Sequence, residues 1–273
     1  MRLFVRFVCF ARSVIFGFFY FPVVTIGFGL GAIIAFQVFR NREKANLMSF
    51  FWAKTCMWFL CIETEVIGVR NIPQGSCLFL FNHTSTADIF ALKAAVKPVK
   101  FGAKIELFQI PIFGHAMQAA GMIPIARGNR EKVIRVYERT IERTKLGEQF
   151  ALAPEGKRNF LETLLPFKTG PFAFAIQAQI PVVPVVILGA HGIWPKNSLL
   201  PRWDRWSQNL SIEFFSAIPS RGLHLDDRQK LMGQVREIMA QRLPKDEEKD
   251  INPDNKNDTE ALAQSGINPP VHG

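Results

Sequence analysis

A histidine and an aspartate five residues apart are the strongest candidates for chemistry in this sequence. His83 and Asp88 occur in the stretch CLFLFNHTSTAD, residues 77–88, where an apolar run is followed directly by polar residues. A five-residue apolar run bounded by turn formers predicts a buried strand. The segment TADIFALKAAV that follows predicts a helix, with Ser85 or Thr86 as its cap.

A strand-to-helix corner of this kind can bring His83 and Asp88 into hydrogen-bond reach. A carboxylate on one imidazole nitrogen fixes the tautomer and leaves the other nitrogen to accept a proton. Serine hydrolases use the same logic, but no serine nucleophile is evident here, so the proton would come from a hydroxyl of the substrate itself. The spacing alone is weak support, because five His and eight Asp in 273 residues produce it by chance in roughly one such protein in six or seven.

The composition favours contact with an anionic partner. The chain has 48% hydrophobic residues, 26 Phe and a net charge of +10, which suits a membrane surface, a phosphorylated substrate or nucleic acid. Nucleic acid is the least favoured of these, because the basic residues are spread along the chain. The cysteines lie in the first third without CxxC spacing, which predicts reduced, packed thiols in a cytosol-facing protein: Cys9, Cys56, Cys61 and Cys77.

The N-terminal segment, residues 1–62, predicts a hydrophobic helical membrane anchor. Residues 14–39 carry no charge, and 26 helical residues extend ~39 Å against ~30 Å for a bilayer core. Pro22 and three glycines interrupt this run, and Arg and Lys flank both of its ends, which suits two cytoplasmic ends. Residues 47–62 form a second apolar segment with one Lys and two Trp, typical of an interfacial helix. We therefore expect a membrane-embedded helical pair and not a single transmembrane span.

Residues 63–243 predict one α/β domain. Strand and helix patterns alternate along it, which indicates a mixed sheet flanked by helices. Its first two strands are expected to be joined by a turn at residues 73–75. The apolar IPVVPV at 180–185 predicts a buried strand whose prolines suit a sheet edge or a bend. The polar residues 244–273 predict a disordered tail.

Four short stretches in this order resemble one known family. They are NHTSTAD (82–88), GMIPIAR (121–127), PEGKR (154–158) and IPVVPV (180–185). Together with Lys104, Glu106 and the FKTG at 167–170, they resemble the acyltransferases that acylate glycerol phosphate and lysophosphatidic acid, in particular the bacterial 1-acylglycerol-3-phosphate acyltransferase type, over about residues 63–219. The resemblance implies a glycerol-phosphate acyltransferase-like fold and a two-helix membrane anchor.

The resemblance implies that His83 is a general base and that Asp88 orients it. An acyl group would pass from a thioester, acyl-CoA or acyl-carrier protein, to the free hydroxyl of 1-acyl-glycerol-3-phosphate, giving phosphatidic acid without a cofactor or metal. A glycerol hydroxyl becomes a competent nucleophile when a base takes its proton during attack. Backbone amides near the helix start or at the turn of Glu155 and Gly156 are candidate donors to the oxyanion.

Three basic residues are the implied phosphate-binding set: Lys104, Arg127 and Arg158. The two arginines follow predicted strands, and ligands bind at the open end of an α/β sheet. Arginine matches a phosphate through paired hydrogen bonds, although a lone arginine is more often a surface residue. Glu155 and Gly156 complete the implied substrate-binding residues, and we interpret Glu155 as a hydrogen-bond acceptor that shapes the turn.

Three positions depart from the family pattern and leave the acceptor open. Pro124 stands where Phe is common, Lys157 where Thr is usual, and Asn159 where Ser is usual. The same His/Asp mechanism on another lysolipid is therefore an alternative. A second alternative is a non-catalytic membrane module that binds lipid phosphate.

A third alternative is a metal-dependent hydrolase that uses His83, His115 and Asp88. The sequence lacks HExxH or paired-His spacing, which does not favour it. His115 and His191 lie outside the four stretches and are interpreted as structural. The expected location is a membrane, at the cytoplasmic face of the cell inner membrane, with the bilayer and both substrates as partners.

Overall fold

The computed structural model describes residues 2–159, 163–194, 198 and 200–243. Across these residues, one seven-stranded sheet has the order β1-β7-β6-β2-β5-β3-β4. Neighbouring strands run parallel except β6 and β7, so the sheet is mixed. The strands are β1 Ile62–Ile67, β2 Leu78–Phe81, β3 Lys100–Lys104, β4 Ile123–Ile125, β5 Phe150–Leu152, β6 Val182–Leu188 and β7 Gln208–Phe214.

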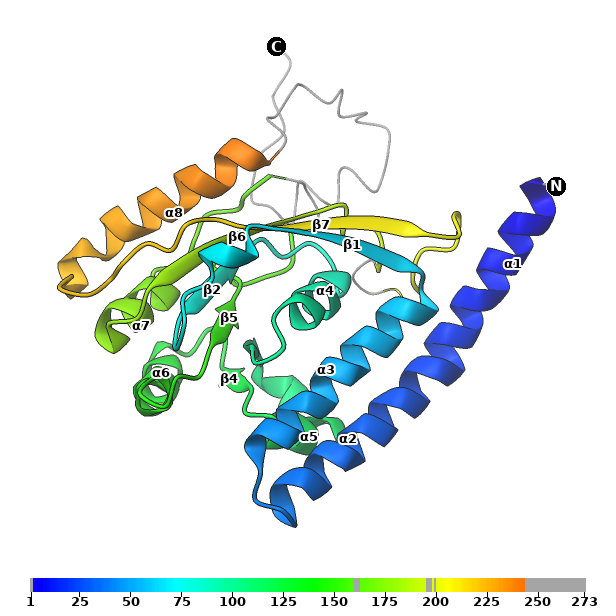
Figure 1. The fold of residues 1–273 in the computed structure, drawn as a ribbon, viewed down its shortest axis with the longest axis horizontal. Coiled ribbons are helices and arrows are strands. Elements are labelled where there is room, and N and C mark those ends of the chain that lie inside the picture. Colours follow the sequence, from blue (N-terminus) through cyan, green and yellow to red (C-terminus); the bar gives the residue numbers. More distant parts are fainter. Residues whose placement is uncertain (1, 160–162, 195–197, 199, 244–273) are drawn as a thin grey trace.

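Helices cover both faces of the sheet, as Figure 1 shows with α4 on one side and α6, α7 and α8 on the other. The helices are α1 Arg2–Ile15, α2 Phe21–Gln37, α3 Arg42–Phe59, α4 Ala87–Ala95, α5 Phe113–Ala119, α6 Arg130–Thr144, α7 Gly170–Ala178 and α8 Arg228–Arg242. This arrangement confirms the predicted fold class, a mixed α/β sheet flanked by helices.

The apolar run of β2 is buried on both faces because helices cover both. Phe79 and Phe81 belong to the core cluster that includes α4, whereas Leu78 and Leu80 belong to the cluster beneath α7 and α8. Successive strand residues point to opposite faces, so a strand covered on both sides has no polar position. The continuous CLFLF run follows from this central place in the sheet.

The first two strands are not neighbours, contrary to the simple turn expected between them. β1 pairs in parallel with β7, and β2 lies between β5 and β6. The connection between them carries a short 3-10 helix, Val69–Asn71, before the predicted turn at 73–75. The partner of β1 comes from a segment about 140 residues later, and local turn residues carry no information about such a pairing.

The prolines of IPVVPV do not mark a sheet edge. β6 lies inside the sheet, between β2 and β7, so the predicted edge position is wrong. β7 pairs with β6 only over Val185–Leu188, and Pro184 lies just before this ladder. The Pro184 carbonyl still accepts a hydrogen bond from the Phe215 amide (3.0 Å). The proline is tolerated because it stands where pairing with β7 begins.

The N-terminal helices form a pair against the sheet domain. α1 continues through a π-helical turn, Phe16–Tyr20, into α2, and α3 returns beside α2 (Figure 1). The helix over Leu3–Gln37 is long and apolar enough to cross a membrane by length and composition. Large apolar side chains along it are exposed, including Leu3, Phe4, Phe7, Phe19, Val23 and Ile34. The predicted helical pair is therefore present, and its long helix is a candidate membrane anchor.

A buried lysine joins this helical pair to the sheet domain. Lys93 on α4 is 1% exposed, and its Nζ donates to Asn46 Oδ1 (2.7 Å) on α3. The same Nζ donates to the carbonyls of Lys97 (2.9 Å) and Val99 (2.7 Å), just before β3. Asn46 Nδ2 in turn donates to the Pro98 carbonyl (3.0 Å). One side chain thus ties α3, α4 and the start of β3 together.

Two expectations concern the rest of the chain. All four cysteines are free, and three of them are buried. The predicted tail, residues 244–273, lies outside the described residues. The domain boundaries proposed from the sequence stay predictions, although β1 begins at Ile62.

Candidate active site

The turn between β2 and α4 brings His83 and Asp88 together. His83 Nδ1 lies 3.0 Å from Asp88 Oδ2, and the same carboxylate oxygen accepts from the amides of Thr84 (2.6 Å) and Ser85 (2.8 Å). Asp88 lies in the first turn of α4, where a carboxylate is favoured, and it fixes the turn before the helix as well as the imidazole. Because Nδ1 donates to the carboxylate, Nε2 is left to accept a proton. We call residues 82–88 the His–Asp corner.

Asn82 fastens this corner to the neighbouring strand. Its buried side chain donates to the Ile187 carbonyl (2.9 Å) and accepts from the Ile187 amide (2.7 Å) near the end of β6. Ser85 Oγ accepts from the amides of Trp194 (3.1 Å) and Ala87 (3.3 Å). Asn82 carries a role in positioning that the sequence analysis did not assign, since its pattern gave only the end of an apolar run.

A loop after β5 fixes His83 from the other side. Glu155 is buried and accepts from the amides of Leu165 (3.0 Å) and His83 (3.5 Å). Burial raises the pKa of Glu155 to about 7, and these backbone hydrogen bonds oppose the shift. The Asn159 amide donates to the His83 carbonyl (2.7 Å). Gly156 has φ +73°, a left-handed conformation that favours glycine. Glu155 thus shapes the loop as an acceptor, while its role in substrate binding stays a prediction.

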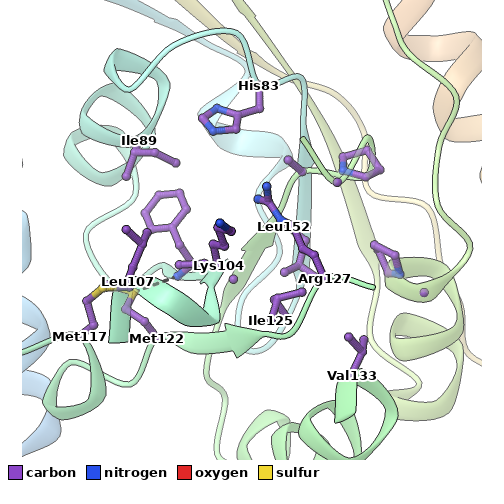
Figure 2. Close-up of a pocket in the computed structure, with 18 of the residues that line it drawn as sticks. His83, Ile89, Lys104, Leu107, Met117, Met122, Ile125, Arg127, Val133 and Leu152 are labelled. Atoms are coloured by element: carbon purple, nitrogen blue, oxygen red, sulfur yellow. Dashed lines mark hydrogen bonds between the residues drawn. The ribbon is translucent and has the colours of Figure 1, made fainter. Parts of the chain in front are cut away.

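The predicted phosphate-binding cations converge beside His83. β2, β5, β3 and β4 are parallel neighbours, so their carboxyl ends open at one edge of the sheet. His83 follows β2, Arg158 follows β5, Lys104 ends β3 and Arg127 follows β4. All four line one cavity of about 1140 Å³. Figure 2 shows His83 above Lys104 and Arg127 in this cavity.

The charges of these cations are incompletely balanced. Lys104 Nζ lies 3.5 Å from Glu106 Oε1, and both side chains are about half exposed. Burial lowers the pKa of Arg158; the charge of Asp88 opposes this, and the charge of Arg127 lowers it further. Burial also lowers the pKa of Arg127, against the charge of Glu106. Partly buried cations that repel one another favour an anion between them.

The same cavity has an apolar limb that the sequence analysis did not assign to the site. It lies between α2, α3 and α5, and its lining includes Phe28, Gly29, Ala32, Trp52, Phe113 and Met117. Phe28, Gly29, Ala32 and Trp52 belong to residues 1–62, which we interpreted as anchor alone, whereas the rest of the limb comes from the α/β domain. By contrast, residues 180–185, the last of the four stretches that resemble the family, are not among the described residues that line the cavity.

Comparisons with known proteins agree with this arrangement. A family model described as Acyltransferase matches residues 63–188. A 1-acyl-sn-glycerol-3-phosphate acyltransferase of Saccharomyces cerevisiae is 30% identical over 248 residues, which cover 87% of this chain and 78% of that protein. The chain belongs to the 1-acyl-sn-glycerol-3-phosphate acyltransferase family. The resemblance identified from the four sequence stretches is confirmed.

Other relatives cover different shares of the acyltransferase. A chloroplastic 1-acyl-sn-glycerol-3-phosphate acyltransferase of Brassica napus is 30% identical over 168 residues, 61% of this chain and 48% of that protein. The chain therefore spans about half the length of this relative. The crystal structure of a 1-acyl-sn-glycerophosphate acyltransferase from Thermotoga maritima superposes with a TM-score of 0.66, covering 88% of this chain and 95% of that one. At 22% identity, this likeness establishes a shared fold.

Several backbone amides considered as oxyanion donors are already used. The Thr84 and Ser85 amides donate to Asp88, and the Gly156 amide donates to the Ala153 carbonyl (3.1 Å). A buried amide that already has an acceptor gains little from a second one. The expectation that these amides hold the oxyanion is therefore not supported, and the cations at the cavity are the nearest alternative donors.

The remaining histidines lie apart from the site. His115 is exposed on α5 and His191 is exposed before β7, and neither lines the cavity. The ligand set of His83, His115 and Asp88 is thus not brought together. Over the described part of the chain, no group of three or more His, Cys, Asp or Glu side chains is placed to hold a metal ion.

Proposed function

We propose that this acyltransferase moves an acyl group from a thioester donor to the free hydroxyl of 1-acyl-glycerol-3-phosphate. The observation that carries the proposal is the His–Asp corner opening onto a cavity with three cations on one side and an apolar limb on the other. The names of the relatives support the same acceptor.

His83 acts as the general base in the proposed reaction. Nε2 takes the hydroxyl proton while the hydroxyl oxygen attacks the thioester carbonyl. The new C–O bond forms, the C–S bond breaks, and the leaving thiolate takes the proton back from the imidazolium. Asp88 stabilises that imidazolium and holds the ring, because its Oδ2 bonds Nδ1 at 3.0 Å. The reaction needs two substrates, with no cofactor and no covalent enzyme intermediate.

Lys104, Arg127 and Arg158 hold the acceptor phosphate in this proposal. Three partly buried cations neutralise a phosphate monoester and fix its distance from His83. The apolar limb suits an alkyl chain, because its lining is almost entirely hydrocarbon. A phosphate-free lysolipid would leave the cations unpaired, and a choline-capped one would offer a single negative charge with a quaternary ammonium attached.

The helical pair lies in one leaflet of the membrane, with the site toward the cytoplasm, in the same proposal. A straight helix of 35 residues extends ~52 Å, well beyond a ~30 Å hydrocarbon core. The exposed Arg6 in its first third suits the headgroup region, whereas Arg12 is buried and donates to the carbonyls of residues 205 and 206. Cysteines introduced at Leu3 and Glu43 test this, since an impermeant reagent should label both from the cytoplasmic side. Labelling from opposite sides would instead establish a span.

The deciding experiment is an acyl-transfer assay on purified full-length protein. Acceptors are 1-acyl-glycerol-3-phosphate, monoacylglycerol and lysophosphatidylcholine, each with acyl-CoA and with acyl-carrier protein. We expect transfer to the phosphate monoester at least tenfold faster than to the other two. Equal rates with all three acceptors would contradict the proposed acceptor, whereas the proposed acyl transfer would stand. No transfer with any pair, by a protein that binds the phosphate monoester, would favour the non-catalytic binding module.

A further inference from the structure

The cavity contains more positive charge than one acceptor phosphate needs. Among the described residues, its lining includes seven Lys and Arg residues and no Asp or Glu: Lys104, Arg127, Arg130, Lys157, Arg158, Lys168 and Arg228. Three of these are committed to the acceptor phosphate in the proposal above. We call Arg130, Lys168 and Arg228 the basic limb.

The basic limb lies at the starts of three helices. Arg130 is the first residue of α6, Lys168 comes two residues before α7, and Arg228 is the first residue of α8. A cation at a helix N-terminus is unfavourable, because the unsatisfied amides there already make this end positive. Local helix stability therefore does not explain these cations. An anion between them would reverse the balance and also meet the amides of the helix starts.

In the part of the chain that the structure describes, no acidic side chain pairs with the basic limb. Within the described residues, Arg130 and Lys168 make no side-chain hydrogen bond or ion pair, and Arg228 donates only to the Leu225 carbonyl (2.8 Å). Such side chains are available to a ligand without breaking an existing pair. They also repel one another within one cavity, so binding an anion should stabilise the folded protein.

Apolar side chains of the cavity and helix α6 lie on opposite sides of the two cations Lys104 and Arg127. In Figure 2, Ile89, Leu107 and Met117 lie to one side of Lys104 and Arg127, and Val133 of α6 lies to the other. α6 is the helix that Arg130 begins. A thioester donor has the same polarity, with an alkyl chain on one side of the carbonyl and a phosphate-bearing pantetheine arm on the other.

We propose that the basic limb binds a phosphate group carried by the pantetheine arm of the thioester donor. The inference rests on the proposed function, since it assigns the donor of that reaction. The pantetheine arm separates the thioester from its first phosphate, which accounts for a second cluster of cations away from His83. Acyl-coenzyme A and acyl-carrier protein share this phosphate, so both donors fit the limb.

A double variant and a matched control test the limb. Arg130→Gln with Lys168→Gln removes two cavity cations, whereas Lys132→Gln with Arg139→Gln removes two exposed cations of α6 that do not line the cavity. We expect the first pair to raise the donor KM about tenfold for each cation lost and to leave the acceptor KM unchanged. The control pair should change neither. An unchanged donor KM in the cavity variant would overturn the proposal.

A comparison of three donors shows whether the limb recognises the phosphate or another part of the donor. Acyl-coenzyme A, acyl-carrier protein and a phosphate-free acyl-pantetheine thioester are compared in wild type and in the double variant. The phosphate-free donor should react poorly in wild type and should lose no further activity in the variant. If wild type used the phosphate-free donor as well as the phosphate-bearing donors, the role proposed for the basic limb would be wrong. The acyltransferase proposal would stand.

A binding measurement decides the inference independently of turnover. Coenzyme A and phosphopantetheine-loaded carrier protein, both without an acyl group, are titrated into wild-type and variant protein by calorimetry. Binding by wild type with at least tenfold loss in the cavity variant supports the limb, even for a preparation that transfers no acyl group. Absence of binding to wild type, or equal binding to both proteins, would overturn it.

Discussion

The His–Asp corner and the cavity cations are held in opposite ways. In the corner, Asp88 Oδ2 accepts three hydrogen bonds and Asn82 bonds both backbone groups of Ile187. Among the described residues, Lys168 and Arg130 have no such partner, and Lys104 has one loose ion pair, with Glu106. The protein preorganises the corner, whereas in the proposed function the cations would acquire their partners from the ligand. Substitutions in the two regions should therefore have effects that differ in kind as well as in size.

The largest effect is expected for His83→Ala. Loss of a general base lowers the rate by about 10²–10⁴-fold. The backbone groups of His83 that bond Glu155 and Asn159 remain, so the midpoint of thermal unfolding should stay close to that of wild type. Initial rates of 1-acyl-glycerol-3-phosphate acylation measure this, with His191→Ala as the control at an exposed histidine. A rate near that of wild type would show that His83 is not the base.

Asp88→Asn should lower activity and stability together. The imidazole loses the charge that stabilises its protonated form, so the rate falls about 10²-fold or more. The Thr84 and Ser85 amides lose a charged acceptor in a buried site, which costs about 1–3 kcal/mol of unfolding free energy. Denaturant unfolding and acyl-transfer assays on the same preparation check both. A variant that is inactive but as stable as wild type would show that Asp88 does not stabilise the turn before α4.

Glu155 gives the corner a pH-dependent stability. Its folded pKa is about 7 against 4.5 for the ordinary group, so the folded state keeps a proton that the unfolded state releases. Unfolding free energy should therefore fall as pH rises from about 4.5 to 7, by about 3 kcal/mol at most. Glu155→Gln removes this group and should flatten that part of the curve. Denaturant midpoints across pH 4.5–8 measure it, and an unchanged slope in the variant would refute the assignment.

The smallest effect is expected for a cation of the cavity. Arg158→Ala should raise the acceptor KM about tenfold, with a lesser fall in kcat and no change in the donor KM or in stability. Arg139→Ala, at an exposed arginine outside the cavity, is the matched control. Kinetics with monoacylglycerol complete the test, because a phosphate-free acceptor should not sense the loss. An equal penalty for both acceptors would mean that Arg158 supports the loop and not the phosphate.

The sequence could predict the features that lie within short stretches and could not predict the strand order. The His–Asp corner was predictable because strand, turn, cap and carboxylate lie within one short stretch, 77–88. Family membership and the placement of Lys104, Arg127 and Arg158 were accessible through the four stretches that resemble the family. The strand order was not, since β1 pairs with a segment about 140 residues away and Pro184 lies inside the sheet.

The grouping of the basic limb could not be predicted, because its residues lie at the starts of three separate helices. Arg130, Lys168 and Arg228 are about 40 to 60 residues apart in the sequence and meet only after α6, α7 and α8 pack on one face of the sheet. Each alone is typical of an exposed helix end. The apolar limb was hidden for a similar reason, since α2 and α3 were interpreted only as an anchor.

Lys93 determines how the acyltransferase meets its lipid. Its hydrogen bond to Asn46 joins α4 to α3, its two others join α4 to the segment before β3, and α4 carries Asp88 in its first turn. Because this buried network links α3 to α4, we expect the helical pair and the His–Asp corner to move together. On the proposed membrane surface, His83 keeps a constant height above the hydrocarbon. In the proposed reaction, the lysolipid headgroup would rise out of the leaflet to reach His83, attracted by the cations of the cavity.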